Sequence, residues 1–298
     1  MKKLHVLVYT VLLSFLTPVH ALTIEIDYSL DTGFFNSPTK KSVMNAAAQY
    51  FSNLINDNLG AINIPQQNVS LPGSTITSTK TINSAEGVLT VFTGGVDFIG
   101  SVLGRGGPVW SSATGSRGQT GHTGNSATAT DFAPLYGEIS FDTTGTSWFF
   151  DTSLSTASDI PHASADFYSV ALHELGHVLG LGASPSWDHY VKNGEFTGPN
   201  ATALFGGNIA LNSGSDHWAN GTSSTIAATG NFETAMDPSI TLGTRKPFTD
   251  LDIAALKDVG WEISSVPVPP AIGLFAVGLI ALFGLRNKPG KFIVAKSS

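Results

Sequence analysis

Hydrophobic and polar positions near the start of the chain predict a strand followed by a helix. In LTIEIDYSL, the apolar Ile24, Ile26 and Tyr28 alternate with polar residues, as they do along a half-buried strand. Residues 37–60 then place apolar side chains at helical spacing and end at a glycine. We therefore expect a helix that begins near the serine at the head of this stretch and closes at Gly60.

The middle of the chain combines strand patterns with one aperiodic tract. Residues 88–102 are rich in β-branched and aromatic residues and predict one or two strands. Residues 104–130 are mostly Gly, Ser and Thr without periodicity, which is typical of a surface loop. Residues 137–151 predict a further strand, a turn and an aromatic corner.

Two helices are predicted in the second half, separated by a stretch without periodicity. The first begins near Asp166 and ends at Gly180, a typical left-handed C-terminal position. Residues 181–247 carry Gly, Asn, Ser and Thr throughout. The second helix has Thr249 as its N-cap and Gly260 at its end. The order of elements predicts an α+β fold with a loop-rich second half.

Composition narrows the function classes. Charged residues are 12% of the chain and the net charge is −7, so the chain lacks the basic surface that nucleic acid requires. There are no cysteines, which excludes disulfides, cysteine-ligated metals and a thiol nucleophile. Any metal must therefore be held by His, Asp, Glu or backbone oxygens.

The first residues have the features of a secretory signal. Lys2 and Lys3 precede an apolar run from Leu4 to Leu16, and a small-residue cleavage site ends at Ala21. We expect residues 1–21 to be removed on export.

The last residues, 264–298, combine a Pro-rich hinge, the apolar run Ala271 to Leu285, and then Arg286 and Lys288. The run is short for a membrane span, and the following cations favour an orientation with the N-terminal side outside. This arrangement resembles PEP-CTERM sorting tails, which an exosortase recognises and cuts in Gram-negative bacteria. A plain C-terminal membrane anchor is the alternative. Residues 22–263 would then be the catalytic domain.

The predicted helix before Gly180 carries the strongest chemical signal, HELGH. His173 and His177 are four residues apart and share one helix face, so both imidazoles can reach one cation. Glu174 lies beside them, where a carboxylate can take a proton from a metal-bound water. H-E-x-x-H is the signature of zinc hydrolases, with the glutamate as general base.

A third ligand is not evident locally, because Ala183 stands six residues after His177. A glutamate ligand would need a following helix, which the pattern does not show. His189 with its neighbour Asp188, or the more distant His217 beside a tryptophan, could close the site. The full set of candidates is His122, His162, Asp188, His189, Glu195, His217 and Glu233.

The extended motif HELGHVLGLG resembles the metzincin zinc proteases, in which a glycine turns the chain after the helix. The stretch SDHWANG followed by ETAMDPSI resembles the matrixin-like and leishmanolysin-like bacterial branch of that family. The resemblance implies that His217 is the third ligand. It also implies that Met236, before the turn at Asp237 and Pro238, forms the Met-turn floor and is not a ligand.

This resemblance implies a fold, a cofactor and a reaction. The fold would be a twisted, mostly parallel sheet with two long helices over a cleft and a loop-rich lower subdomain. His173, His177 and His217 would hold Zn²⁺, and Glu174 would activate a zinc-bound water to hydrolyse peptide bonds. Such an endopeptidase would act on proteins or peptides, in the cell envelope or outside a Gram-negative cell.

Two other functions fit the same residues. The chain could be a non-catalytic envelope or matrix protein built on a decayed protease scaffold, or a zinc hydrolase of a non-protein substrate. Asp142, Asp151 and Asp159 lie in polar stretches and could supply oxygens to a structural calcium, although solvated loop carboxylates look the same in a sequence.

Overall fold

The computed structural model describes residues 22–57, 59–110 and 131–264. The predicted signal peptide and nearly all of the predicted C-terminal segment lie outside these residues. None of the helices in the described part of the chain has the length and hydropathy needed to cross a bilayer. The two terminal segments therefore stay predictions.

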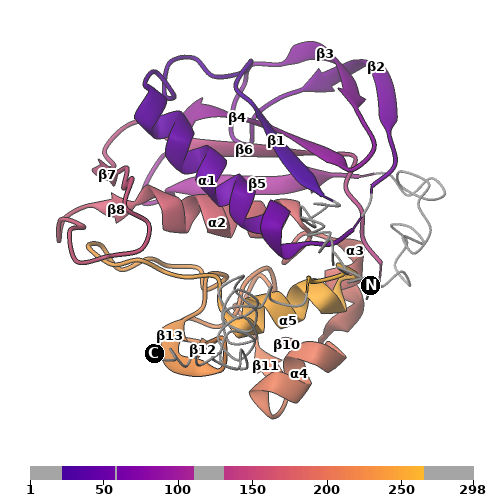
Figure 1. Cartoon of the computed structure of the whole chain (residues 1–298), viewed down its shortest axis with the longest axis vertical. Coiled ribbons are helices and arrows are strands. Elements are labelled where there is room, and N and C mark those ends of the chain that lie inside the picture. Colours follow the sequence, from indigo (N-terminus) through magenta and orange to yellow (C-terminus); the bar gives the residue numbers. More distant parts are fainter. Residues whose placement is uncertain (1–21, 58, 111–130, 265–298) are drawn as a thin grey trace, which may run out of the picture. The chain divides into compact units, whose positions relative to one another are not determined.

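A four-stranded sheet forms the upper part of the protein in Figure 1. Its strands, in spatial order, are β1 (Thr23–Asp27), β4 (Val88–Val96), β6 (Tyr136–Asp142) and β5 (Gly104–Val109). β1, β4 and β6 run parallel, whereas β5 is antiparallel to β6 and forms one edge. The predicted mixed architecture with a mostly parallel sheet is therefore confirmed.

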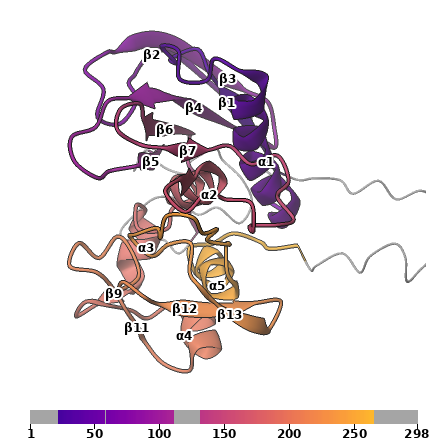
Figure 2. The same ribbon diagram turned by 90° about the vertical axis from the view of Figure 1, so that its left-hand side faces the viewer.

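Two long helices cover one face of this sheet. α1 (Pro38–Leu54) and α2 (Phe167–Val178) pack against the strands and against each other (Figures 1 and 2). Leu89 in β4 and Phe141 in β6 point into this layer and are fully buried. Removing such side chains from water is the main favourable term that holds a helix layer on a sheet.

α1 begins where the sequence predicts and ends earlier. The side chain of Ser37 caps its first turn. The predicted end at Gly60 is wrong, because the helix ends at Leu54. The next residue, Ile55, adopts an extended backbone, is buried, and forms an antiparallel bridge with Ile263. A contact with the far end of the domain therefore stops the helix before its glycine.

A hairpin that the hydrophobic pattern does not predict covers the other face of the sheet. It consists of β2 (Ile62–Val69) and β3 (Ser78–Ser84). Val69 and Ile82 pack over Phe92 of β4 in a second, smaller core. Most other side chains of the two strands are polar, so the strands carry too few apolar positions to be recognised from the sequence.

The predicted surface loop over residues 104–130 is wrong at its beginning. Residues 104–109, GRGGPV, form the edge strand β5, in which Gly106 pairs with Ile139. Glycines carry no side-chain pattern, so only the pairing with β6 defines this strand. Residues 111–130 lie outside the described part of the chain.

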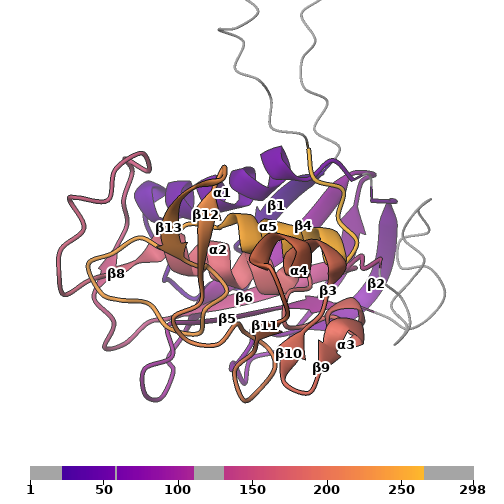
Figure 3. The same cartoon turned by 90° about the horizontal axis from the view of Figure 1, so that it is seen from below.

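Short elements fill the lower half, where the sequence shows no periodicity. They are α3 (Pro185–Tyr190), β9 (Val191–Lys192), β10 (Glu195–Phe196), α4 (Pro199–Phe205), β11 (Ile209–Ala210), β12 (Ser223–Ile226), β13 (Thr229–Glu233) and α5 (Asp250–Asp258). Two short strands, β7 (Trp148–Phe149) and β8 (Ala165–Asp166), precede α2. Seen from below, α4 and α5 lie side by side in front of α2 (Figure 3).

Aromatic packing stabilises this lower half. The rings of Trp187 and Phe196 stack with centroids 4.3 Å apart, and Trp218 lies 5.1 Å from Trp187. All three side chains are fully buried. This cluster connects α3 and β10 to the chain around residue 218. The preceding residue is His217, the third of the predicted metal ligands.

Candidate metal centre

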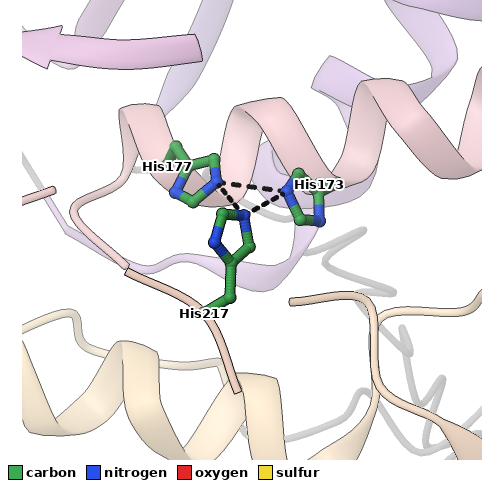
Figure 4. A group of neighbouring side chains, drawn as sticks. All are labelled: His173, His177 and His217. Atoms are coloured by element: carbon green, nitrogen blue, oxygen red, sulfur yellow. Dashed lines mark hydrogen bonds between the residues drawn. The ribbon is translucent and has the colours of Figure 1, made fainter. Parts of the chain in front are cut away.

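α2 carries two histidines and is anchored at both ends. Asp166 caps its first turn by accepting a hydrogen bond from the Ser169 N–H at 3.2 Å. At the other end, Gly180 turns the chain with a φ of +104°, where a side chain would be strained. Between these ends one helix face lies in the core, and His173 and His177 project toward the lower half (Figure 4).

The chain brings a third imidazole to this pair. The Nε2 atom of His217 lies 3.0 Å from that of His173 and 3.1 Å from that of His177, and the latter two are 3.1 Å apart. His217 reaches them from a loop below the helix (Figure 4), which an antiparallel bridge between Leu211 and Trp218 closes. Three ring nitrogens from two distant segments therefore converge on one point.

Each imidazole also directs its Nδ1 atom at an oxygen that accepts a hydrogen bond. The pairs are His173 with the Ala235 carbonyl (2.7 Å), His177 with the Leu181 carbonyl (2.7 Å) and His217 with the Asp216 carboxylate (2.9 Å). In a neutral ring the proton therefore lies on Nδ1, which leaves the Nε2 lone pair free. Such oxygen partners are typical of metal-binding histidines.

This donor set fits a zinc ion. Three lone pairs at this separation repel one another unless a cation lies between them. Tetrahedral zinc with bonds of about 2.0–2.1 Å holds its nitrogen donors roughly 3.3 Å apart, close to the separations seen here. Among the described residues, these three histidines are the group of metal-ligating side chains whose donor atoms come together.

Burial keeps these rings in the neutral form that binds metal. Burial lowers the pKa of His177 to about 4, and the neighbouring His217 ring acts in the same direction. The pKa of His173 is also lowered, first by burial and then by the other two imidazoles. Both rings are thus neutral at neutral pH.

Among the described residues, the other candidate ligands do not join this group. His189 and Asp188 lie on α3, where the His189 ring packs against Tyr190. His162 is exposed, and the Glu195 carboxylate accepts a hydrogen bond from the Asn208 side-chain amide. Glu233 Oε1 lies 3.4 Å from Lys246 Nζ. His122 is outside the described residues.

The side chain of Glu174 extends from α2 toward the edge strand β5. It is only 4% exposed, and the backbone N–H of Gly106 donates a hydrogen bond to its carboxylate. Burial raises the pKa of Glu174 to about 8, although the Gly106 hydrogen bond and the nearby Arg105 guanidinium act in the opposite direction. A divalent cation close by would favour the ionised carboxylate that proton transfer requires.

The glycines of β5 make room for this carboxylate. A Cβ on Gly104 would lie 2.7 Å from Glu174 Oε1, and a Cβ on Gly106 would lie 2.6 Å from the Glu174 backbone oxygen. Both distances are far below van der Waals contact. The edge strand can pass this close to α2 because residues 104 and 106 have no side chains there.

Met236 packs against α2 between the two helical histidines. It is 1% exposed, and a Cβ on Gly176 would lie 2.6 Å from the Met236 sulfur. The Met236 carbonyl accepts a hydrogen bond from the Trp218 N–H at 3.1 Å. The methionine therefore lies under the helix and is linked by its backbone to the residue after His217.

Asp252 in α5 connects these segments through hydrogen bonds. Its fully buried carboxylate accepts hydrogen bonds from the Ala235 N–H (2.9 Å), the Met236 N–H (3.3 Å) and the Trp218 indole (2.9 Å). Each of these groups adjoins a histidine or its oxygen partner. Nothing local in the sequence marks this role, because all three partners are distant.

The centre opens into a cleft of about 1120 Å³. Its lining includes Gly104 to Gly106 of β5, Glu174, and residues of the segment from Ala235 to Leu242. Lys246 lies in the cleft with its ammonium group 2.8 Å from Asp237 Oδ1, so its charge is neutralised. The cleft is large enough to bury several residues of a polypeptide or a small-molecule ligand.

The carboxylates considered for calcium do not form a cluster in the described part of the chain. Asp142 accepts hydrogen bonds from the Phe98 N–H and the Thr146 hydroxyl. Asp151 pairs with Arg245 at 2.6 Å, and Asp159 is exposed. Protein donors thus occupy two of the three carboxylates.

Comparison with known families gives one match. Residues 112–191 match the family model of Peptidase_M10, the matrixins. The matched segment contains α2 with His173, Glu174 and His177, and it ends before His217 and Met236. No curated protein and no solved structure matches the chain. The matrixin match supports a metzincin-like family of zinc metalloproteases. The ligand roles of His173, His177 and His217 and the catalytic role of Glu174 stay predictions.

Proposed function

We propose that this protein is an exported zinc-dependent endopeptidase. The observation that supports it best is the convergence of His173, His177 and His217 beside a buried glutamate in an open cleft. The matrixin match covers the helix that contributes two of these histidines and the glutamate.

The residues of the cleft suit peptide hydrolysis. Zinc bound by the three histidines would supply a Lewis acid and a water of lowered pKa. Glu174, fixed between α2 and β5, would take the proton of the attacking water and deliver it to the leaving amine. The oxygen partners of the three Nδ1 atoms hold the rings in place and keep their free nitrogens unprotonated.

The edge of the sheet suits an extended substrate. β5 is the outermost strand on the side that lines the cleft, and strands at a sheet edge have main-chain groups available for pairing. A polypeptide in extended conformation can add to such an edge through backbone hydrogen bonds. A protein or peptide substrate is therefore proposed over a small molecule.

Export and sorting are proposed from the two terminal segments. Residues 1–21 would direct the chain out of the cytoplasm, and residues 264–298 would engage the membrane, at least transiently, and an exosortase-like enzyme. The mature protein would then lie in the cell envelope or outside a Gram-negative cell. A mass spectrum of the mature protein tests both ends, because uncut termini would contradict the proposal.

The test of the activity compares the wild-type protein with Glu174→Ala and Glu174→Gln. We expect all three to bind zinc and only the wild type to digest casein or gelatin. Glu195→Gln, a change at an exposed glutamate, is the matched control and should keep full activity. Equal digestion by wild type and Glu174→Ala would contradict the assignment.

The same experiment separates the two alternatives. A decayed scaffold would bind little zinc or have no activity to lose. A hydrolase of another class would leave casein and gelatin intact and act on lipid or glycan substrates, and that activity would still depend on Glu174.

A further inference from the structure

The loop after α2 contacts His177 through Leu181 and the segment that carries His217 through Gly182. The Leu181 carbonyl accepts the hydrogen bond from His177 Nδ1, and the next residue, Gly182, has a φ of +68°. The loop is held firmly to the helix, because the Leu181 N–H donates to the Gly176 carbonyl at 3.1 Å and the Leu181 side chain is fully buried.

The segment that carries the third histidine crosses this loop at Gly182. A Cβ at residue 182 would lie 1.9 Å from the carbonyl oxygen of Asp216 and 2.7 Å from its carbonyl carbon. The contact is made by backbone and cannot be relieved by rotating a side chain. Asp216 immediately precedes His217 and also accepts the hydrogen bond from its Nδ1 atom.

Of the two crossing segments, the later one is less buried. Leu181 is fully buried, whereas residues 215–217 are only partly buried, although hydrogen bonds with Asn212 (2.7–3.4 Å) and from the Trp187 indole to the Ser215 carbonyl (2.8 Å) hold their turn. A side chain at residue 182 would therefore displace Asp216 and His217 and leave Leu181 and His177 in place. The third imidazole would move away from the other two.

We propose that Gly182 is a positioning residue for the metal centre: its missing side chain is what allows His217 to reach the pair on α2. The inference rests on the proposed zinc site. It also explains how the centre is completed although Ala183, one residue later, offers no ligand. Because the two segments can cross at Gly182, a histidine forty residues downstream of His177 can reach the centre.

The test compares Gly182→Ala with Gly194→Ala. Both glycines have a positive φ, +68° and +79°, so both variants strain the backbone to a similar extent. Only residue 182 meets other atoms, because nothing lies within 4 Å of a Cβ at residue 194. Zinc affinity is measured by competition with a chromophoric chelator, and the thermal melting of the metal-free proteins is recorded beside it.

We expect Gly182→Ala to weaken zinc binding about tenfold or more, the range found when the support of a metal-binding histidine is disturbed. Gly194→Ala should bind zinc as the wild type does. In a His217→Ala background, Gly182→Ala should have no further effect on zinc affinity, because the ligand through which it acts is gone.

Three results would overturn this inference. They are unchanged zinc affinity in Gly182→Ala, an equal loss in the His217→Ala background, and a Gly182→Ala chain that does not fold while Gly194→Ala folds. The last would show that the crossing supports the core rather than the third ligand. Failure of the proposed zinc site itself is distinguishable, because the wild-type protein would then bind no zinc.

Discussion

The Nε2 atoms of His173 and His217 lie 3.0 Å apart although 44 residues separate them in the chain. Each ring is turned by a hydrogen bond on its other nitrogen, from His173 to the Ala235 carbonyl and from His217 to the Asp216 carboxylate. The approach of the two rings therefore depends on α2, on the segment at Ala235 and on residues 216–217. Single substitutions can test these dependences separately.

Removing the third imidazole should abolish tight zinc binding. We expect His217→Ala to weaken zinc affinity at least about 100-fold, since even the loss of an outer hydrogen-bond partner costs ~10–100-fold. His189→Ala is the control, because His189 lies on α3 away from the centre. The measurement is zinc content after dialysis together with chelator competition. A sharp loss in His189→Ala instead would contradict the assigned ligand.

The metal-free protein should lose stability in mild acid. A histidine in the unfolded chain has a pKa near 6.5, whereas the pKa of the folded His177 is about 4. As the pH falls from 6.5 toward 4, the unfolded state binds a proton before the folded state does, so the free energy of unfolding decreases. Below pH 4 the free energy of unfolding is lower by about 3 kcal/mol because of His177. Above pH 6.5 the ring is neutral in both states and causes no such loss.

Urea unfolding of chelator-treated protein between pH 7 and 4 measures this effect. His177→Gln lacks the titrating ring, so its metal-free form should depend less steeply on pH over the same range. Parallel curves for the two proteins would show that His177 is not the source of the acid sensitivity.

A methyl group on the edge strand should displace Glu174. We expect Gly104→Ala to lower kcat about 100-fold, because a catalytic group moved by about 1 Å loses that much. Zinc content should be unchanged, since the three atoms nearest to a Cβ at residue 104 all belong to the Glu174 side chain and none to a histidine. Gly107→Ala on the same strand is the matched control, because nothing lies within 4 Å of its Cβ. Equal kcat values for the two variants would show that the carboxylate adapts.

Arg245 should stabilise the fold strongly. Its guanidinium pairs with Asp151 at 2.6 Å and with Asp166, the cap of α2, at 2.9 Å, and all three side chains are largely buried. We expect Arg245→Ala to lower the free energy of unfolding by about 3–5 kcal/mol, because two buried carboxylates lose their countercharge. Denaturant unfolding measures the loss. Arg105→Ala, at an exposed arginine, should change stability by much less.

Which features the sequence predicts depends on how local they are. The sequence predicts the helix from Asp166 to Gly180 correctly, because its cap, its apolar face and its terminal glycine all lie within that stretch. It does not predict the end of α1, because Ile55 leaves the helix to pair with Ile263 at the far end of the domain. The local pattern that predicts a helix carries no information about a partner so far away in the sequence.

Helical periodicity is enough to place His173, Glu174 and His177 on one helix, so their spacing can be read from the chain. Three other features follow from how distant segments fold together. His217 rather than His189 faces the helical pair, Asp252 holds the surrounding loops by hydrogen bonds, and the glycines of β5 lie against Glu174. These contacts join residues that lie tens of positions apart in the chain. Packing and backbone hydrogen bonds bring them together, and neither leaves a periodic trace in the chain.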